Sequence, residues 1–128
     1  DSLEWFGKYS QSSPAILICE SDEKIIGWGS LSAYRSGREA LMHCNEITFY
    51  VHRDHRRQGV AQFLLDQLEK IAFESMVKHL VVILLDSNSK SESLLAKNGY
   101  ELWGMLPNIV QFEDSEASHL YMGKHIPS

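Results

Sequence analysis

The spacing of hydrophobic residues changes along the middle of the chain, and each change predicts a new element. From Glu46 to Val51 apolar and polar residues alternate, as in a strand with one buried face. After the polar run His52 to Arg57, apolar residues recur every three or four positions, which predicts a helix over Val60 to Ser75 that begins near Gly59. His79 to Leu85 is apolar throughout, as in a strand buried on both faces and paired in parallel. Together these segments predict a β-helix-β unit.

The residues before this unit predict an antiparallel hairpin. Ala15 to Glu20 and Ile25 to Ala33 are strand-like, and the polar sequence S-D-E-K joins them. In the second strand Gly27 and Gly29 flank Trp28. We expect the indole to pack on the sheet and the two glycines to make room for it.

The sequence starts at Asp1, and its first residues have the pattern of the end of a helix, not of its start. Ser2 to Lys8 has the pattern of a helix end, and Tyr9 to Pro14 that of a loop. We therefore expect the domain to be incomplete at its N-terminus. With 128 residues, 44% of them hydrophobic, residues 1–128 suit one compact domain with a core.

The C-terminal third predicts one more helix and two strands. Ser89 and Glu92 form a capping-box pattern, and Asn98-Gly99 suits the left-handed end of the helix that follows. After the helix we expect a strand, a break, a loop and a last strand at Tyr100–Leu106, Pro107, Ile109–Ala117 and His119–His125.

Composition and charge exclude several functional classes. The net charge is −5 and no long basic stripe occurs, which argues against a nucleic-acid partner. No apolar run reaches the ~20 residues needed to span a bilayer, and Cys19 and Cys44 read as buried thiols, so we expect a cytoplasmic protein without a membrane partner. His52 and His55 form H-x-x-H without a third ligand at a recognisable spacing, so we predict no metal site.

The segment R-R-Q-G-V-A, Arg56 to Ala61, has the features of an anion site. The N–H groups of a helix's first turn and its dipole attract negative charge. Gly59 lets the backbone approach a ligand closely, and Arg56 and Arg57 can bind a diphosphate in bidentate fashion. The spacing fits neither the P-loop nor the dinucleotide-binding fingerprint.

With these residues in place, the chain resembles the GCN5-related N-acetyltransferases (GNAT). The hallmark of that family, [QR]-x-x-G-x-[GA], joins its central strand to a helix, and Arg56, Gly59 and Ala61 fill the three positions. The motifs N-x-x-S-x-x-L and K-N-G-Y, which begin at Asn88 and Lys97, make the chain most similar to the phosphinothricin acetyltransferase branch. The resemblance implies an α/β (α+β) fold, with a mixed, mostly antiparallel sheet around a central cofactor-binding βαβ unit. The implied missing part is a first strand and most of a helical pair.

The resemblance also implies an activity and a set of site residues. The activity is transfer of an acetyl group from acetyl-CoA to the primary amine of a small amino-acid-like substrate of the phosphinothricin or methionine sulfoximine type. Glu46 is the implied general base, since the attacking amine must be neutral. The implied cofactor-binding residues are Phe49, Tyr50, Val51, Arg56, Arg57, Gln58, Gly59, Val60, Ala61 and Asn88.

The chain departs from the family pattern at the position of a general acid. Where many members carry a tyrosine that protonates the departing thiolate, this chain has Leu95. Arg35 stands close to an arginine of the branch and is the implied carboxylate-binding residue. Two other functions stay open: a non-catalytic acyl-CoA-binding or regulatory module, and an enzyme of the same fold that acetylates proteins or peptides. The branch also implies a homodimer, with weak support from apolar residues at Trp103, Met105 and Leu106.

Overall fold

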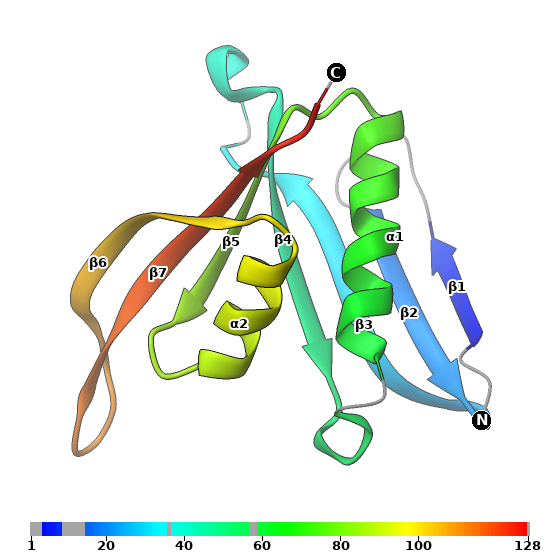
Figure 1. Ribbon diagram of the computed structural model, residues 1–128, viewed down its shortest axis with the longest axis horizontal. Coiled ribbons are helices and arrows are strands. Elements are labelled where there is room, and N and C mark those ends of the chain that lie inside the picture. The colour runs from blue at the N-terminus through cyan, green and yellow to red at the C-terminus, as the bar shows by residue number, and fades with distance from the viewer. Residues whose placement is uncertain (1–3, 9–14, 36, 57–58, 128) are drawn as a thin grey trace.

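The computed structural model describes residues 4–8, 15–35, 37–56 and 59–127. Seven strands form one sheet in the order β1-β2-β3-β4-β5-β7-β6, and both helices lie on the same face of it (Figure 1). Every strand pair is antiparallel except β4 with β5. The strands and helices are β1 (Glu4–Lys8), β2 (Ala15–Ser21), β3 (Lys24–Ala33), β4 (Cys44–Val51), α1 (Val60–Glu74), β5 (His79–Leu85), α2 (Ser89–Lys97), β6 (Glu101–Gln111) and β7 (Glu116–His125). The predicted α/β class, with a mixed and mostly antiparallel sheet, is confirmed.

The N-terminal strands form an antiparallel meander. Asp22 and Glu23, between β2 and β3, have φ angles of 52° and 65°, which suit the two-residue turn of a twisted hairpin. The predicted helix end before them is wrong, because Glu4–Lys8 is a strand paired with β2. So short a segment has no decisive periodicity, and the free edge of β2 determines its conformation. The loop predicted at Tyr9 to Pro14 lies outside the described residues.

The central β4-α1-β5 unit has the predicted order and bounds to within two residues. Its parallel ladder is short, because Cys44, Asn45 and Glu46 pair with His79, Leu80 and Val81. Beyond that point β4 and β5 diverge, and Figure 1 shows their carboxyl ends pointing apart.

The core lies between the sheet and the helices. Leu64, Leu65 and Leu68 of α1 are fully buried against β2, β3 and β4. A Cβ atom on Gly29 would lie 2.8 Å from Leu68 Cδ1, and one on Gly27 would lie 3.0 Å from Val60 Cγ1. The two glycines therefore make room for α1, not for Trp28 as expected, and the neighbouring Trp28 is 39% exposed.

The C-terminal hairpin is longer than predicted. β6 continues through Pro107 to Gln111, and β7 already begins at Glu116, so most of the expected loop is strand. Pro107 is tolerated because β6 is an edge strand, where a missing N–H needs no partner. The pairing shifts between Leu106 and Val110, and Asn108 takes a positive φ of 55°. In the described ranges, neither helix has the length and apolar character of a membrane crossing.

Candidate active site

A cavity of about 870 Å³ opens where β4 and β5 separate. It is bordered by the end of β4, the first turn of α1, and α2 with the loop before it. Its lining residues are Phe49, Tyr50, Val51, His55, Arg56, Gly59, Val60, Ala61, Gln62, Ser87, Asn88, Ser89, Lys90, Ser91, Ser93, Leu94 and Lys97. Eight of the ten cofactor residues expected from the sequence lie in this lining, and the other two, Arg57 and Gln58, are outside the described residues.

The charge of this cavity is opposite to that of the whole chain. Arg56, Lys90 and Lys97 line it, and none of the described lining residues is aspartate or glutamate. The chain as a whole carries a net charge of −5. A local positive potential inside an acidic protein favours an anionic ligand.

The first turn of α1 faces this cavity through Gly59. This residue is the N-cap of the helix, with φ 79°, and its carbonyl accepts the N–H of Phe63 at 2.9 Å. A Cβ atom on Gly59 would meet nothing within 4 Å, so the backbone is open on this side. The adjacent Arg56 donates from Nε to the carbonyl of Val51 at 3.4 Å, which ties the arginine to the end of β4. The arrangement suits a phosphate at a helix N-terminus.

The start of α2 forms the opposite wall. Asn88 is the N-cap, and its side-chain oxygen accepts the N–H of Ser91 at 3.2 Å. The capping residue predicted from the sequence, Ser89, is already the first helical residue. The shift by one position follows from the turn after β5, in which the Asn88 N–H donates to Leu85 and leaves Asn88 at non-helical angles. Helix α2 ends at Lys97 with Asn98 as its C-cap, and Gly99 has the expected left-handed φ of 88°.

Several lining residues were not identified from the sequence. Lys90, Leu94 and Lys97 are spaced four and three apart, so one face of α2 lines the cavity. This spacing could have identified the three residues from the sequence, given the expectation that α2 borders the cofactor site. Gln62 lies just beyond the motif that predicted the anion site.

Glu46 lies where the two parallel strands begin to separate. It is the last residue of β4 that pairs with β5, opposite Val81, and its partner on β3 is Ser32. The side chain is half-buried and lies on the sheet face away from α1 by the alternation with buried Ile47. It is not among the residues that line the 870 Å³ cavity. Glu46 is therefore at the narrow end of the opening between the strands, on the opposite face of the sheet.

Arg35 lies in the loop after β3 and is not among the residues that line the cavity. Its guanidinium carbon is 5.2 Å from the centre of the Tyr34 ring, and the side chain is exposed. The Tyr34 N–H donates to the carbonyl of Cys44 at 3.1 Å. Glu46 is two residues beyond Cys44 along β4, so these two residues are roughly 7 Å apart at the rise of a strand. Leu95, at the position of the family tyrosine, is completely buried in the core.

The H-x-x-H pair has a local structural role. His52 is the N-cap of a short 3₁₀ turn, Arg53–His55, and its Nδ1 accepts the N–H of Asp54 at 3.2 Å. In the part of the chain that the structure describes, no three His, Cys, Asp or Glu side chains converge on a point where a metal ion could bind.

Comparison with known proteins identifies relatives of this arrangement. The family model described as "Acetyltransferase (GNAT) family" matches residues 1–100. YwnH of Bacillus subtilis, a protein provisionally named phosphinothricin acetyltransferase, is 25% identical over 126 residues, which cover 98% of this chain and 77% of YwnH. The L-amino acid N-acyltransferase MnaT of Escherichia coli is 25% identical over 108 residues, 84% of this chain and 62% of MnaT.

A solved structure gives the same fold. The protein yncA of Salmonella typhimurium, determined with its cofactor acetyl-CoA, superimposes with a TM-score of 0.83 at 20% identity. The alignment covers 90% of this chain and 66% of the yncA chain.

Proposed function

The chain belongs to the acetyltransferase (GNAT) family, and from that premise we propose that it acetylates the primary amine of a small amino-acid-like substrate. It is an acyltransferase with acetyl-CoA as its acetyl donor. Family membership favours this activity over the alternative of a non-catalytic acyl-CoA-binding module. The observation that carries the proposal is the basic cavity at the N-terminus of α1, beside the end of β4.

Two chain segments are suited to hold the cofactor. We assign the pyrophosphate to the backbone from Arg56 to Ala61, where the open Gly59 and the dipole of α1 favour anionic oxygens. Arg57 and Gln58 belong to this proposed segment and lie outside the described residues. The pantetheine arm is assigned to Phe49, Tyr50 and Val51 on one side and Asn88 on the other. When bound, acetyl-CoA supplies an activated thioester carbonyl.

Glu46 is our candidate for the general base. A protonated amine has no lone pair with which to attack the thioester, so a carboxylate that accepts its proton, directly or through a water, speeds the reaction. The position of Glu46 supports this role, because it is the last β4 residue paired with β5 and stands three residues before Phe49, where the cavity lining begins. No side-chain acid is assigned to the leaving thiolate, since Leu95 lies in the core. A thiolate is a good enough leaving group to depart without one.

The substrate class rests on Arg35 and on the relatives. YwnH carries the name of an enzyme for phosphinothricin, an amino-acid analogue, and MnaT is named for L-amino acids. Arg35 is exposed in the loop after β3, three residues past Ser32, the β3 partner of Glu46, and its guanidinium could hold a substrate carboxylate through two parallel hydrogen bonds. We place the reaction in the cytoplasm, which agrees with Cys19 and Cys44 being free thiols.

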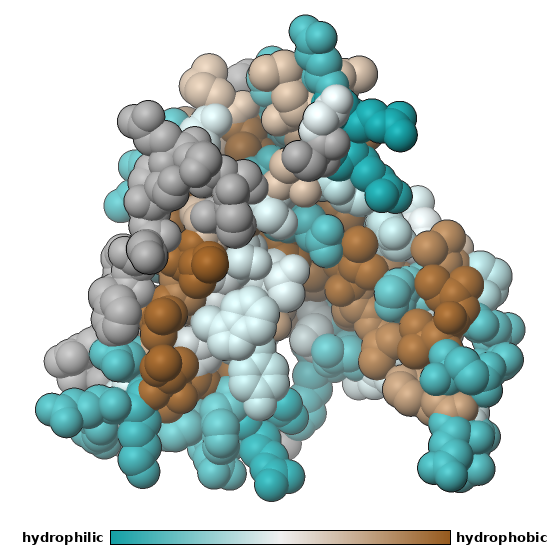
Figure 2. All heavy atoms as spheres, turned by 180° about the vertical axis from the view of Figure 1, so that it is seen from behind, coloured by the Kyte–Doolittle hydropathy of each residue, from teal (hydrophilic) through white to brown (hydrophobic). Residues whose placement is uncertain are grey.

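We further propose a homodimer formed through the edge strand β6. Leu102, Met105 and Ile109 of this strand are each more than half exposed. Figure 2 shows the apolar surface that they and their neighbours form over the β6–β7 hairpin. A second copy is a self-complementary way to cover such a patch.

The cofactor assignment is tested by Gly59→Val. A branched side chain at this position would occupy the space where a phosphate must approach, so we expect the dissociation constant for acetyl-CoA to rise roughly tenfold or more, a loss of about 1.4 kcal/mol or above. Gly37→Val is the matched control, because Gly37 has the same φ of 79°, also has open space around it, and lies outside the cavity. Calorimetry on both folded variants measures the effect. Equal affinities in the two variants would contradict the assignment.

The base assignment is tested by Glu46→Gln, which keeps the shape of the side chain and removes its basicity. We expect kcat at neutral pH to fall by about 10²- to 10⁴-fold, with affinity for acetyl-CoA almost unchanged. Glu20→Gln on β2 serves as a control for the loss of one carboxylate. Full activity with an unshifted acidic limb in the pH–rate profile would exclude Glu46.

The substrate class is tested by Arg35→Ala with a panel of amines. Loss of a charged hydrogen-bond pair should lower kcat/KM for amino acids by roughly 10- to 100-fold. The kcat/KM for analogues of these amino acids that lack the carboxylate should stay unchanged. Arg38→Ala, a second exposed arginine in this loop, is the control. An unchanged kcat/KM for every amino acid, or acetylation of peptides alone, would refute the carboxylate-binding role and favour the protein or peptide acetyltransferase.

The dimer is tested by sedimentation or light scattering at micromolar concentration. The wild-type protein should have the mass of two chains, and Met105→Glu should shift it to one. Phe73→Glu, which places a charge at an equally exposed position on α1, should leave the dimer intact. A wild-type monomer would refute this part of the proposal.

A further inference from the structure

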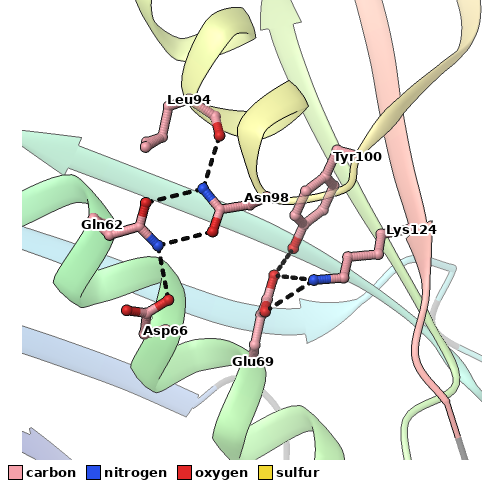
Figure 3. A network of polar contacts seen from close by, with 7 residues as sticks. All are labelled: Gln62, Asp66, Glu69, Leu94, Asn98, Tyr100 and Lys124. Atoms are coloured by element: carbon pink, nitrogen blue, oxygen red, sulfur yellow. Dashed lines mark hydrogen bonds and ion pairs between the residues drawn. The ribbon is translucent and has the colours of Figure 1, made fainter.

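A closed set of amide hydrogen bonds joins the two helices that border the cavity. Asn98 Nδ2 donates to Gln62 Oε1 at 2.9 Å, and Gln62 Nε2 donates back to Asn98 Oδ1 at 2.8 Å (Figure 3). The second proton of Gln62 Nε2 goes to Asp66 Oδ1, and that of Asn98 Nδ2 goes to the carbonyl of Leu94, both at 2.8 Å. All four amide protons and both amide oxygens are thus in use.

The outer partners determine how the two amides are oriented. The Asp66 carboxylate and the Leu94 carbonyl can only accept hydrogen bonds, so a 180° flip of either amide would bring two oxygens together. The reciprocal Gln62–Asn98 pair therefore has one arrangement, and that arrangement fixes the distance between α1 and α2 at this point.

A second link lies further along the same face of α1. Gln62, Asp66 and Glu69 are spaced four and three residues apart. Glu69 accepts the hydroxyl of Tyr100 at 2.7 Å and the Nζ of Lys124 at 3.2 and 3.3 Å (Figure 3). Burial raises the pKa of Tyr100, with a further contribution from its hydrogen bond to Glu69, so the hydroxyl stays a donor. Because Tyr100 lies only three residues after the end of α2, this link supports the first.

Apolar packing alone holds α2 weakly. Within this helix, which the structure describes in full, only Leu95 is buried. Space between α1 and α2 belongs to the cavity, with Gln62 and Leu94 in its lining, so large apolar side chains there would fill the site. A polar connection at the end of the cavity holds the two walls together and leaves the space between them open.

We propose that the Gln62–Asn98 pair is a positioning device that keeps the cofactor cleft at its binding width before acetyl-CoA arrives. The inference rests on the proposed cofactor site. A cleft held open in advance spares the ligand the entropic cost of ordering α2, so the pair raises affinity by pre-organisation without touching the reacting atoms. Asn98 is the informative residue because, unlike Gln62, it does not line the cavity.

The experiment compares the wild-type protein with Asn98→Leu, which keeps the size of the side chain and removes all its hydrogen bonds. We expect the dissociation constant for acetyl-CoA to rise roughly tenfold, with a less favourable binding entropy in calorimetry. KM for acetyl-CoA should rise in parallel, while kcat at saturating acetyl-CoA stays close to that of the wild type. The backbone amides of α2 should exchange hydrogen faster in the free variant and regain protection when acetyl-CoA is added.

Two further variants separate this effect from general loss of stability. Ala72→Gly weakens α1 at its far end, away from the cavity, and should lower Tm without changing affinity for acetyl-CoA. Asp66→Ala removes the acceptor that orients the Gln62 amide and should shift the affinity in the same direction as Asn98→Leu, by a smaller factor. It keeps the test available if Asn98→Leu does not fold.

Unchanged exchange of α2 together with unchanged affinity in Asn98→Leu, or in Asp66→Ala if Asn98→Leu does not fold, would overturn the positioning role. An equal loss of affinity in Ala72→Gly would do the same. A wild-type protein that binds no acetyl-CoA would instead overturn the proposed cofactor site. Because hydrogen exchange in the free protein reports on the pair without any ligand, the two failures are distinguishable.

Discussion

The structure depends on how briefly β4 and β5 pair. Two parallel strands in the middle of a sheet would normally satisfy each other's backbone groups along their whole length. Here the ladder stops after Glu46 and Val81, so the carboxyl halves of both strands leave an opening in the sheet. The helices that follow the two strands begin beside this opening. One interruption in a hydrogen-bond ladder thus accompanies the cavity, places two helix starts beside it, and leaves Glu46 at the point where the strands separate.

Sequence patterns were sufficient where local chemistry determines the result. The change of period around Gly59 gave the β4-α1-β5 order, and the arginine-glycine start of α1 identified one wall of the cavity. Patterns failed where a distant partner determines the conformation. Glu4–Lys8 became a strand because β2 offers an edge, and Pro107 did not end β6 because that edge needs no donor. The amide pair of Gln62 and Asn98 joins residues 36 positions apart, and no local signal marks it.

Polar contacts connect the walls of the cavity, where apolar packing would fill the space between them. The core between α1 and β2, β3 and β4 is built mainly from leucine, isoleucine and valine, with Gly27 and Gly29 allowing the helix to approach closely. Around the cavity the same close packing would remove the binding space. There the walls are connected by hydrogen bonds whose donors and acceptors are matched, so that neither amide has an alternative arrangement of equal energy.

The irregular path of β6 has a consequence for how this molecule behaves at high concentration. An exposed edge strand with several large apolar side chains is the usual starting point for open-ended strand addition and fibre growth. Pro107 offers no N–H on this edge, and Asn108 turns the backbone through a left-handed angle. The row of backbone groups along this edge is therefore interrupted near its middle, which opposes a continuous cross-β ladder along the whole strand. The β6–β7 hairpin can therefore expose an apolar surface and still resist aggregation by strand addition.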